Sequence, residues 1–192
     1  MAKRKLPHSL EPEHVQAMMD ACNVETITGL RLRVVLELLY HAGVRNRELR
    51  MLRPGDVHMT RGLLSISLGA KGGWERTVPL LAETVIWLRQ WEKVRPASKW
   101  LVSTLRGSML GGRWMQQAVK RIAQRANLGQ IRVHPHAFRH TYATECLRRG
   151  MNLRQVQELL GHANVETTQI YTHIALPELS DGFRRAWGKE AG

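Results

Sequence analysis

The chain has 192 residues, of which 43% are hydrophobic, enough to bury one substantial core in a single domain or a closely joined pair. Its 29 lysines and arginines against 16 aspartates and glutamates give a formal net charge of +13, which favours a polyanion as partner over a membrane surface. The basic start is not followed by an apolar run, and no apolar stretch is long enough to span a bilayer, so we expect a soluble, cytoplasmic protein without a secretory signal.

The first part of the chain predicts helices. Ser9 is expected to cap a helix that tolerates Pro12 in its first turn and carries apolar residues at helical spacing. Thr28 is expected to start a second helix, in which apolar residues cover so much of the circumference that it must be central to the core before it ends near Gly43. A short third helix over residues 46–52 ends at the turn signal Pro-Gly-Asp.

The hydrophobic period then changes from helical to alternating. Leu64, Ile66 and Leu68 alternate with serines, and a second extended run covers residues 75–79. This segment predicts a β-hairpin whose glycine-rich turn covers residues 69–73.

Helical patterns return after the hairpin. Helices are expected near residues 85–94, 115–126, 135–149 and 152–160, then in a segment capped by Asn164, and finally over residues 177–187. The predicted fold class is therefore mainly α with one small antiparallel β-sheet, an α+β arrangement. Cys22 and Cys146 lie within apolar helical patterns and are predicted to be reduced core residues.

Four separated segments contain basic, histidine and tyrosine residues in a suggestive order. Arg45 comes directly after the glycine that ends a buried helix, and Lys71 stands near the tip of the predicted hairpin. His136 and Arg139 share one helix face at i and i+3. The fourth segment is Leu159-Leu160-Gly161-His162, with Tyr171 nine residues after the histidine.

In order, spacing and local context, these segments resemble those of the tyrosine recombinases, the phage integrase family, over nearly the whole chain. The family pattern is a glycine, one residue, an arginine and then glutamate-leucine; a hairpin lysine; His-x-x-Arg-His; a leucine-glycine-histidine; and a tyrosine about nine residues on. In this sequence the pattern falls on Arg45 with Glu48, Lys71, His136 and Arg139 with His140, His162 and Tyr171.

The resemblance explains why these residue types occur together. Opening a phosphodiester without a metal requires an in-line nucleophile, neutralisation of the non-bridging oxygens and a proton for the leaving 5′ oxygen. Tyr171 is the expected nucleophile, and Arg45 and Arg139 can each present a planar fork to phosphate oxygens. By resemblance, Lys71 protonates the leaving oxygen. His136 assists proton movement, and His162 hydrogen-bonds the phosphate.

The expected product is a 3′-phosphotyrosine with a free 5′ hydroxyl. Because the phosphotyrosine retains the bond energy, no nucleotide cofactor is expected. Zinc is not expected either, since no carboxylate or thiolate near His134, His136 and His140 completes a ligand set, and the family is metal-free. Glu48 and His140 are expected to be supporting residues, Glu48 by holding Arg45 or its short helix and His140 by orienting its neighbours.

Further basic residues are candidates for DNA phosphate or base contacts, although a solvated face explains any single one equally well. Three precede the hairpin and four share the helix after the paired glycines 111 and 112. They are Arg47, Arg50, Arg53, Arg113, Lys120, Arg121 and Arg125.

The resemblance implies a catalytic domain over residues 1–192, with a basic segment at 1–8 and a C-terminal helix at 176–192. In the family such a tail docks on a neighbouring protomer; the alternative is that it folds back on its own domain. Most family members carry an additional N-terminal helical domain. The chain is therefore expected to be either a fragment or a naturally short enzyme, like the fimbrial phase-switch recombinases.

The expected partners are double-stranded DNA recombination sites. The resemblance implies a monomer when free and a homotetramer on two DNA sites, which exchanges strands through a Holliday junction. Two alternatives stay open: a type IB topoisomerase, which shares the chemistry, and a DNA-binding regulator that has kept the fold.

Overall fold

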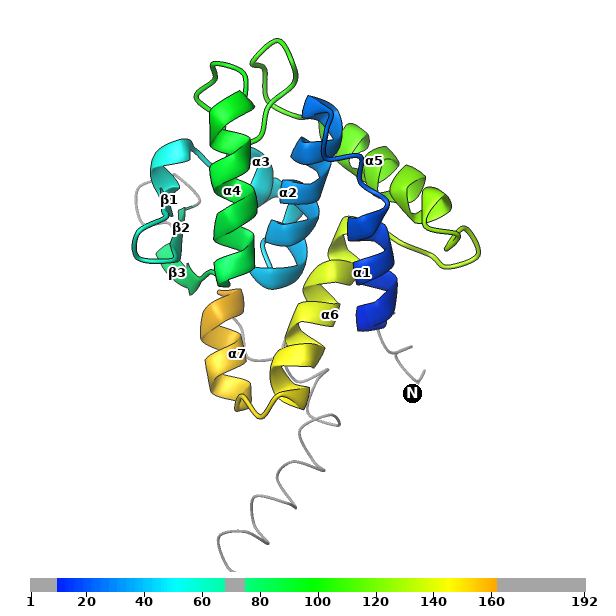
Figure 1. Ribbon diagram of the computed structural model, residues 1–192. Coiled ribbons are helices and arrows are strands. Elements are labelled where there is room, and N and C mark those ends of the chain that lie inside the picture. The colour runs from blue at the N-terminus through cyan, green and yellow to red at the C-terminus, as the bar shows by residue number, and fades with distance from the viewer. Residues whose placement is uncertain (1–9, 68–74, 162–192) are drawn as a thin grey trace, which may run out of the picture.

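The computed structural model describes residues 10–67 and 75–161. The helices are α1 (Pro12–Asp20), α2 (Ile27–His41), α3 (Asn46–Met51), α4 (Ala82–Val94), α5 (Gly112–Arg125), α6 (Pro135–Arg148) and α7 (Leu153–Leu160), with a short 3-10 turn at Pro54–Asp56. Figure 1 shows α2 in the middle of the helices, and it packs against α1, α3, α4 and α6. The predicted class, mainly helical with one small antiparallel sheet, is confirmed.

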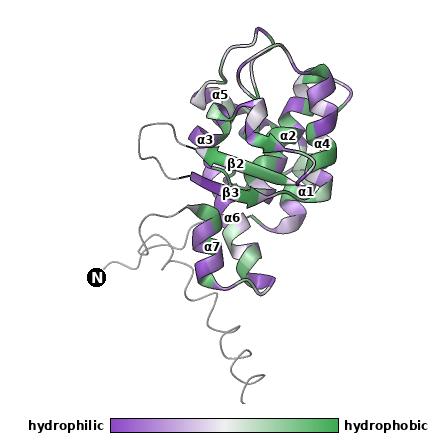
Figure 2. Ribbon diagram, turned by 90° about the vertical axis from the view of Figure 1, so that its left-hand side faces the viewer, coloured by the Kyte–Doolittle hydropathy of each residue, from purple (hydrophilic) through white to green (hydrophobic). Residues whose placement is uncertain are grey.

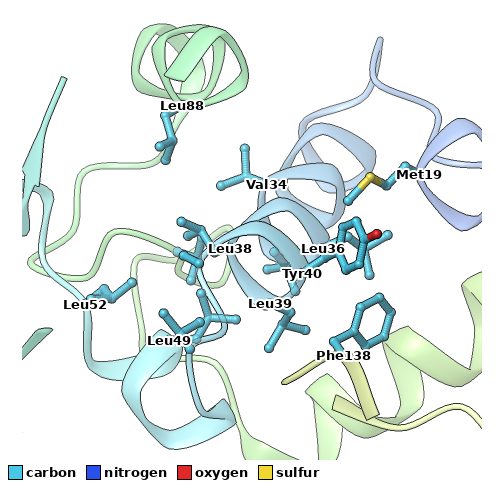
Figure 3. Packing of buried hydrophobic residues seen from close by; sticks show 14 of the residues in the cluster. Met19, Val34, Leu36, Leu38, Leu39, Tyr40, Leu49, Leu52, Leu88 and Phe138 are labelled. Atoms are coloured by element: carbon cyan, nitrogen blue, oxygen red, sulfur yellow. The ribbon is translucent and has the colours of Figure 1, made fainter. Parts of the chain in front are cut away.

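The core surrounds α2, as its apolar sequence predicts. Every residue from Arg33 to Tyr40 on this helix is buried. Figure 3 shows its side chains leaving in several directions to meet Leu88 of α4, Leu49 of α3 and Phe138 of α6. Burial on all sides makes α2 the central helix of the core. The site described below is built around its C-terminal end.

The N-terminal caps of α1 and α2 differ from the prediction. The cap of α2 is Thr26 rather than Thr28: its hydroxyl oxygen accepts a hydrogen bond from the backbone N–H of Gly29 at 3.1 Å. The helix therefore begins at Ile27, and its cap lies two residues before Thr28. Helix α1 begins at Pro12 with Glu11 as its cap, because proline suits the first helical position, where no N–H partner is needed. Ser9 lies outside the described residues.

The hairpin is confirmed, and it is part of a three-stranded antiparallel sheet in the order β1-β2-β3. Strand β1 (Val57–His58) was not predicted, because two residues are too few to show an alternating pattern. Strand β2 (Leu63–Ser67) pairs with β3 (Glu75–Pro79) in a register that places Ile66 opposite Arg76. Figure 2 shows the hydrophilic start of β3, which packs close to α7.

Two smaller predictions concern the cysteines and the membrane. Cys22 is buried and Cys146 half-buried, and both are free thiols. Within residues 10–67 and 75–161, no helix combines the length and the apolar character needed to cross a membrane.

Candidate active site

Arg45 stands at the junction between α2 and α3. Helix α2 ends at His41, and Gly43, with φ of 58°, turns the chain so that Arg45 becomes the residue before α3. The Arg45 side chain is 36% exposed, so its guanidinium borders on solvent.

Glu48 fixes Arg45 in two ways. One carboxylate oxygen, Oε1, accepts a hydrogen bond from Nη1 of Arg45 at 2.6 Å, and the other, Oε2, accepts one from the Arg45 backbone N–H at 2.7 Å. Burial alone raises the pKa of Glu48, but the hydrogen bonds and charges of Arg76 and Arg45 outweigh it and bring the pKa to about 2. Glu48 is therefore a buried carboxylate that orients the Arg45 side chain.

Arg139 reaches the same region from α6. Its side chain is buried, Nη1 donates a hydrogen bond to the carbonyl of Gly43 at 2.6 Å, and Nη2 donates one to the carbonyl of Leu160. Arg45 donates from Nη2 to the carbonyl of the next residue, Gly161, at 3.2 Å. The structure thus brings Arg45 and Arg139 onto consecutive carbonyls at the C-terminal end of α7, where the partial negative charge of the helix favours cations.

Three histidines follow one another along the start of α6. His134 is the N-cap residue, and its Nδ1 accepts a hydrogen bond from the backbone N–H of Ala137 at 3.1 Å. The rings of His136 and His140 meet edge to face with their centroids 4.6 Å apart, as their i,i+4 spacing allows.

Both imidazole rings, those of His136 and His140, are held in the neutral form near pH 7. Desolvation lowers the pKa of His136, and the nearby charges of Arg139, His134 and Arg45 lower it further. Burial, followed by the charges of the neighbouring histidines, lowers the pKa of His140 to about 4. A neutral imidazole beside two guanidinium groups is able to accept a proton. Across the described part of the chain, no three His, Cys, Asp or Glu side chains are grouped to hold a metal ion.

Three of the predicted site residues, Lys71, His162 and Tyr171, lie outside the described residues. Of the other predicted catalytic residues, Arg45 and Arg139 are brought together as described, and His136 lies on α6 three residues before Arg139. The roles assigned to all six remain predictions.

Arg76 is a site residue that the motifs did not reveal. It lies on β3 and donates two hydrogen bonds to the carboxylate of Glu48, from Nη1 at 2.9 Å and from Nη2 at 2.7 Å. Its Nε donates a third to the carbonyl of Leu159 at 2.8 Å. The alternation of β3 could have indicated it, since Arg76 shares an inward position with buried Val78, and an inward guanidinium needs hydrogen-bond acceptors.

The seven candidate DNA-contact residues lie on α3, just after it and on α5. Arg47 and Arg53 are exposed, whereas Arg50 is half-buried and donates from Nε to the carbonyl of Leu110 at 2.5 Å, which fastens α3 to the segment before α5. On α5, all four basic residues are exposed. Two of them line one hollow together with Cys22, which follows α1, and another lines a second hollow together with residues 128–133. They are Arg113, Lys120, Arg121 and Arg125, with Arg121 and Arg125 at the first hollow and Lys120 at the second.

The sequence is similar to known proteins along almost its whole length. The profile of the Phage integrase family matches residues 8–177. The tyrosine recombinase XerD of Ralstonia nicotianae is 38% identical over 185 residues, which cover 91% of this chain and 58% of XerD. The tyrosine recombinase XerC of Vibrio vulnificus is 37% identical over 191 residues, covering 96% of this chain and 58% of XerC. The chain thus spans a little over half the length of these relatives.

Solved structures agree with this relationship. The crystal structure of XerA recombinase superposes with a TM-score of 0.80 at 26% identity, covering 97% of this chain and 68% of XerA. XerH site-specific recombinase, in a post-cleavage complex with palindromic difH substrate, superposes with a TM-score of 0.77 at 27% identity, covering 94% of this chain and 53% of XerH. Because the family profile, the relatives and the fold all agree, this chain belongs to the phage integrase family, the tyrosine recombinases.

Proposed function

We propose that this chain is the catalytic domain of a site-specific DNA recombinase, which cleaves and rejoins DNA through a covalent bond between Tyr171 and a backbone phosphate. The observation that carries this proposal is the convergence of Arg45 and Arg139 on the consecutive carbonyls of Leu160 and Gly161. In the sequence, the next residue is His162, and Tyr171 follows nine residues later.

The environments of the other tyrosines support Tyr171 as the nucleophile. The chain has 3 tyrosines, and the two in the described residues, Tyr40 and Tyr142, are only 9% and 8% exposed. Burial raises the pKa of both phenols, which disfavours the phenolate that would attack phosphorus. Neither is a suitable nucleophile, so the chemistry falls to the remaining tyrosine.

The two arginines are suited to a phosphate undergoing in-line displacement. Arg45 is held by a carboxylate and a carbonyl and borders on solvent, where DNA arrives. Arg139 is buried and is fixed by the carbonyls of Gly43 and Leu160, which come from two different segments. Guanidinium groups held in this way need little reorganisation when charge develops on the non-bridging oxygens, which is the condition for electrostatic catalysis.

The bonds and protons of the proposed step balance. The phenol oxygen of Tyr171 forms a bond to phosphorus while the bond from phosphorus to the 5′ oxygen breaks. The phenol proton passes to a base, for which neutral His136 is suited, and Lys71 supplies a proton to the 5′ oxygen. His162 hydrogen-bonds the phosphate. A 5′ hydroxyl from a second DNA strand then attacks the phosphotyrosine and regenerates the phenol, so no nucleotide cofactor is consumed.

The proposed partners are two double-stranded recombination sites bound by a homotetramer that forms a Holliday junction, with residues 176–192 docking on a neighbouring protomer. The formal charge of +13 supports a DNA partner. XerH was solved on difH DNA, and the Tn1549 transposon integrase on transposon end DNA.

The proposal is tested with nicked suicide substrates prepared from DNA that flanks the gene, in which the cleaved strand loses its 5′ hydroxyl end by diffusion. The wild-type chain should accumulate a covalent complex that survives denaturation. Tyr171→Phe should abolish it, whereas Tyr40→Phe, which removes the hydroxyl of a buried tyrosine, should not. DNA binding without any covalent complex would instead indicate a regulator, and relaxation of supercoiled DNA without paired sites would indicate a topoisomerase.

A further inference from the structure

Arg76 connects three stretches of chain that are distant in the sequence. It projects from β3, its two terminal nitrogens contact both carboxylate oxygens of Glu48 on α3, and its Nε contacts the carbonyl of Leu159 near the end of α7. A fork of this kind fixes both the distance and the plane of the two groups. Arg76 is therefore held by three hydrogen bonds to two residues, which lie 28 and 83 positions away in the sequence.

The carboxylate that Arg76 holds is the same one that holds Arg45. Oxygen Oε1 of Glu48 accepts hydrogen bonds from Nη1 of both arginines, at 2.6 Å from Arg45 and 2.9 Å from Arg76. Because Glu48 is buried, its position depends on these two cations rather than on water. A shift of Arg76 would therefore move Glu48 and, through it, the guanidinium of Arg45.

Arg76 also contacts the end of α7. A Cβ placed on Gly161 would lie 2.9 Å from Cδ and 3.0 Å from Nη1 of Arg76, so the glycine allows the chain to pass directly over this side chain. Gly161 has a left-handed conformation, and its carbonyl is the acceptor for Arg45. The hydrogen bond from Arg76 to the carbonyl of Leu159 also fixes this end of α7.

We infer that Arg76 is a positioning residue that, through Glu48 and the carbonyl of Leu159, keeps Arg45 in place at the end of α7. This inference rests on the proposed function, because the exact position of Arg45 matters for cleavage only if its guanidinium acts on the phosphate. The contacts predict a specific pattern: loss of Arg76 slows strand cleavage much more than it weakens DNA binding.

The test compares Arg76→Lys with a matched control, Arg95→Lys. Arg95 makes a similar two-pronged pair with Glu92 at the end of α4, at 2.7 and 3.2 Å, away from the site. Lysine keeps the charge at either position but cannot form the fork. We expect Arg76→Lys to lower the single-turnover cleavage rate on saturating suicide substrate by about 10- to 100-fold, the range for a small misplacement of reacting groups. The Kd for DNA should change by less than about threefold, and Arg95→Lys should match the wild type.

A pH profile supplies a readout that a purely structural role would not change. The charged groups facing Glu48 are Arg45, the residue before α3, and Arg76 from β3. Its pKa of about 2 keeps Glu48 ionised throughout the assay range in the wild type. Arg76→Gln removes one cation, so the pKa of Glu48 rises, and the cleavage rate of this variant should fall more steeply than that of the wild type as pH is lowered from about 8 to 5.5.

The double variant Glu48→Gln with Arg76→Gln removes both charges together and so avoids an unpaired buried charge if a single variant fails to fold. It should cleave slowly but lack the added pH dependence of Arg76→Gln. If the wild type cleaves and Arg76→Lys cleaves at the same rate, the inference is overturned while the proposed function stands. The inference would also be overturned if Arg76→Lys weakened DNA binding as much as it slowed cleavage and lowered the melting temperature as well. A pH profile of Arg76→Gln parallel to that of the wild type would overturn it too. No covalent complex from the wild type overturns the proposed function and this inference with it.

Discussion

Gly43 lies directly against the aromatic ring of Tyr142, so closely that a Cβ on the glycine would collide with ring atoms Cδ1 and Cε1. The glycine has φ of 58°, and its carbonyl accepts the hydrogen bond from Arg139. The end of α2 therefore meets α6 at a point where backbone, aromatic ring and guanidinium are packed together, next to Arg45.

Gly43→Ala should destabilise the protein by about 2 kcal/mol or more, because a non-glycine residue is strained at this φ and its methyl group has no space. Cleavage should also slow, because the displaced carbonyl no longer fixes Arg139. Urea unfolding and single-turnover cleavage measure the two effects. Gly55→Ala is the control, since no atom lies within 4 Å of a Cβ at that position. Equal stability of the two variants would show that the contact with Tyr142 is easily relieved.

Thr26→Ala should lower the free energy of unfolding by about 1 kcal/mol, the usual contribution of a side-chain N-cap. The catalytic groups lie at the opposite end of α2, so DNA cleavage measured well below the melting temperature should not change. Thr28→Ala, at an exposed position two residues on, serves as the matched variant and should have little effect. The reverse ranking would assign the cap to Thr28.

The stability of the protein should fall in mild acid because of His140. Its pKa is lowered from 6.5 to about 4, so in this range the unfolded chain binds a proton that the folded chain excludes. The contribution of His140 to the free energy of unfolding is present above pH 6.5 and is lost progressively as pH falls from 6.5 toward 4. Unfolding free energies at about pH 7.5 and pH 5 should differ by about 2 kcal/mol from this residue.

His140→Gln should reduce that difference, because glutamine does not titrate. His58→Gln, which replaces an exposed histidine on β1, should leave the difference unchanged. An equal pH slope in the wild type and His140→Gln would show that other groups govern stability in this range.

Lys71→Ala should lose most cleavage of ordinary DNA but recover it on a substrate whose leaving 5′ oxygen is replaced by sulfur. A thiolate leaves without a proton, so the general acid is no longer needed. The loss on ordinary DNA should be about 100- to 10,000-fold, the usual contribution of general acid catalysis. A variant equally slow on both substrates would indicate that Lys71 acts in binding or positioning instead.

The sequence predicted elements that depend on local periodicity. The apolar circumference of α2, the alternation in β2 and the proline that opens α6 each appear in the structure at the expected place. Strand β1 has only two residues, too few to show a period. Thr26 and Thr28 are both suitable cap residues, and only the backbone conformation selects Thr26.

The motifs located Arg45 and Arg139, but not what holds them. Their partners are carbonyls of residues 43, 160 and 161, and a carbonyl occurs at every position, so no sequence pattern marks these contacts. Arg76 was missed for a related reason: its partner Glu48 lies 28 residues earlier on another element, and only the packing of β3 against α3 and α7 brings the two together. Likewise, a shared helix does not give the basic residues of α5 a shared surface: Lys120 lines one hollow, and Arg121 and Arg125 line another.

The central claim is that Tyr171 becomes covalently joined to DNA, and direct identification of the modified residue tests it. The trapped complex is digested with protease and nuclease, and the peptide that carries a nucleotide is sequenced by mass spectrometry. The account predicts a single modified peptide, with the nucleotide joined through its 3′ phosphate to Tyr171. A nucleotide on Tyr40, Tyr142 or a serine, or one joined through a 5′ phosphate, would contradict it.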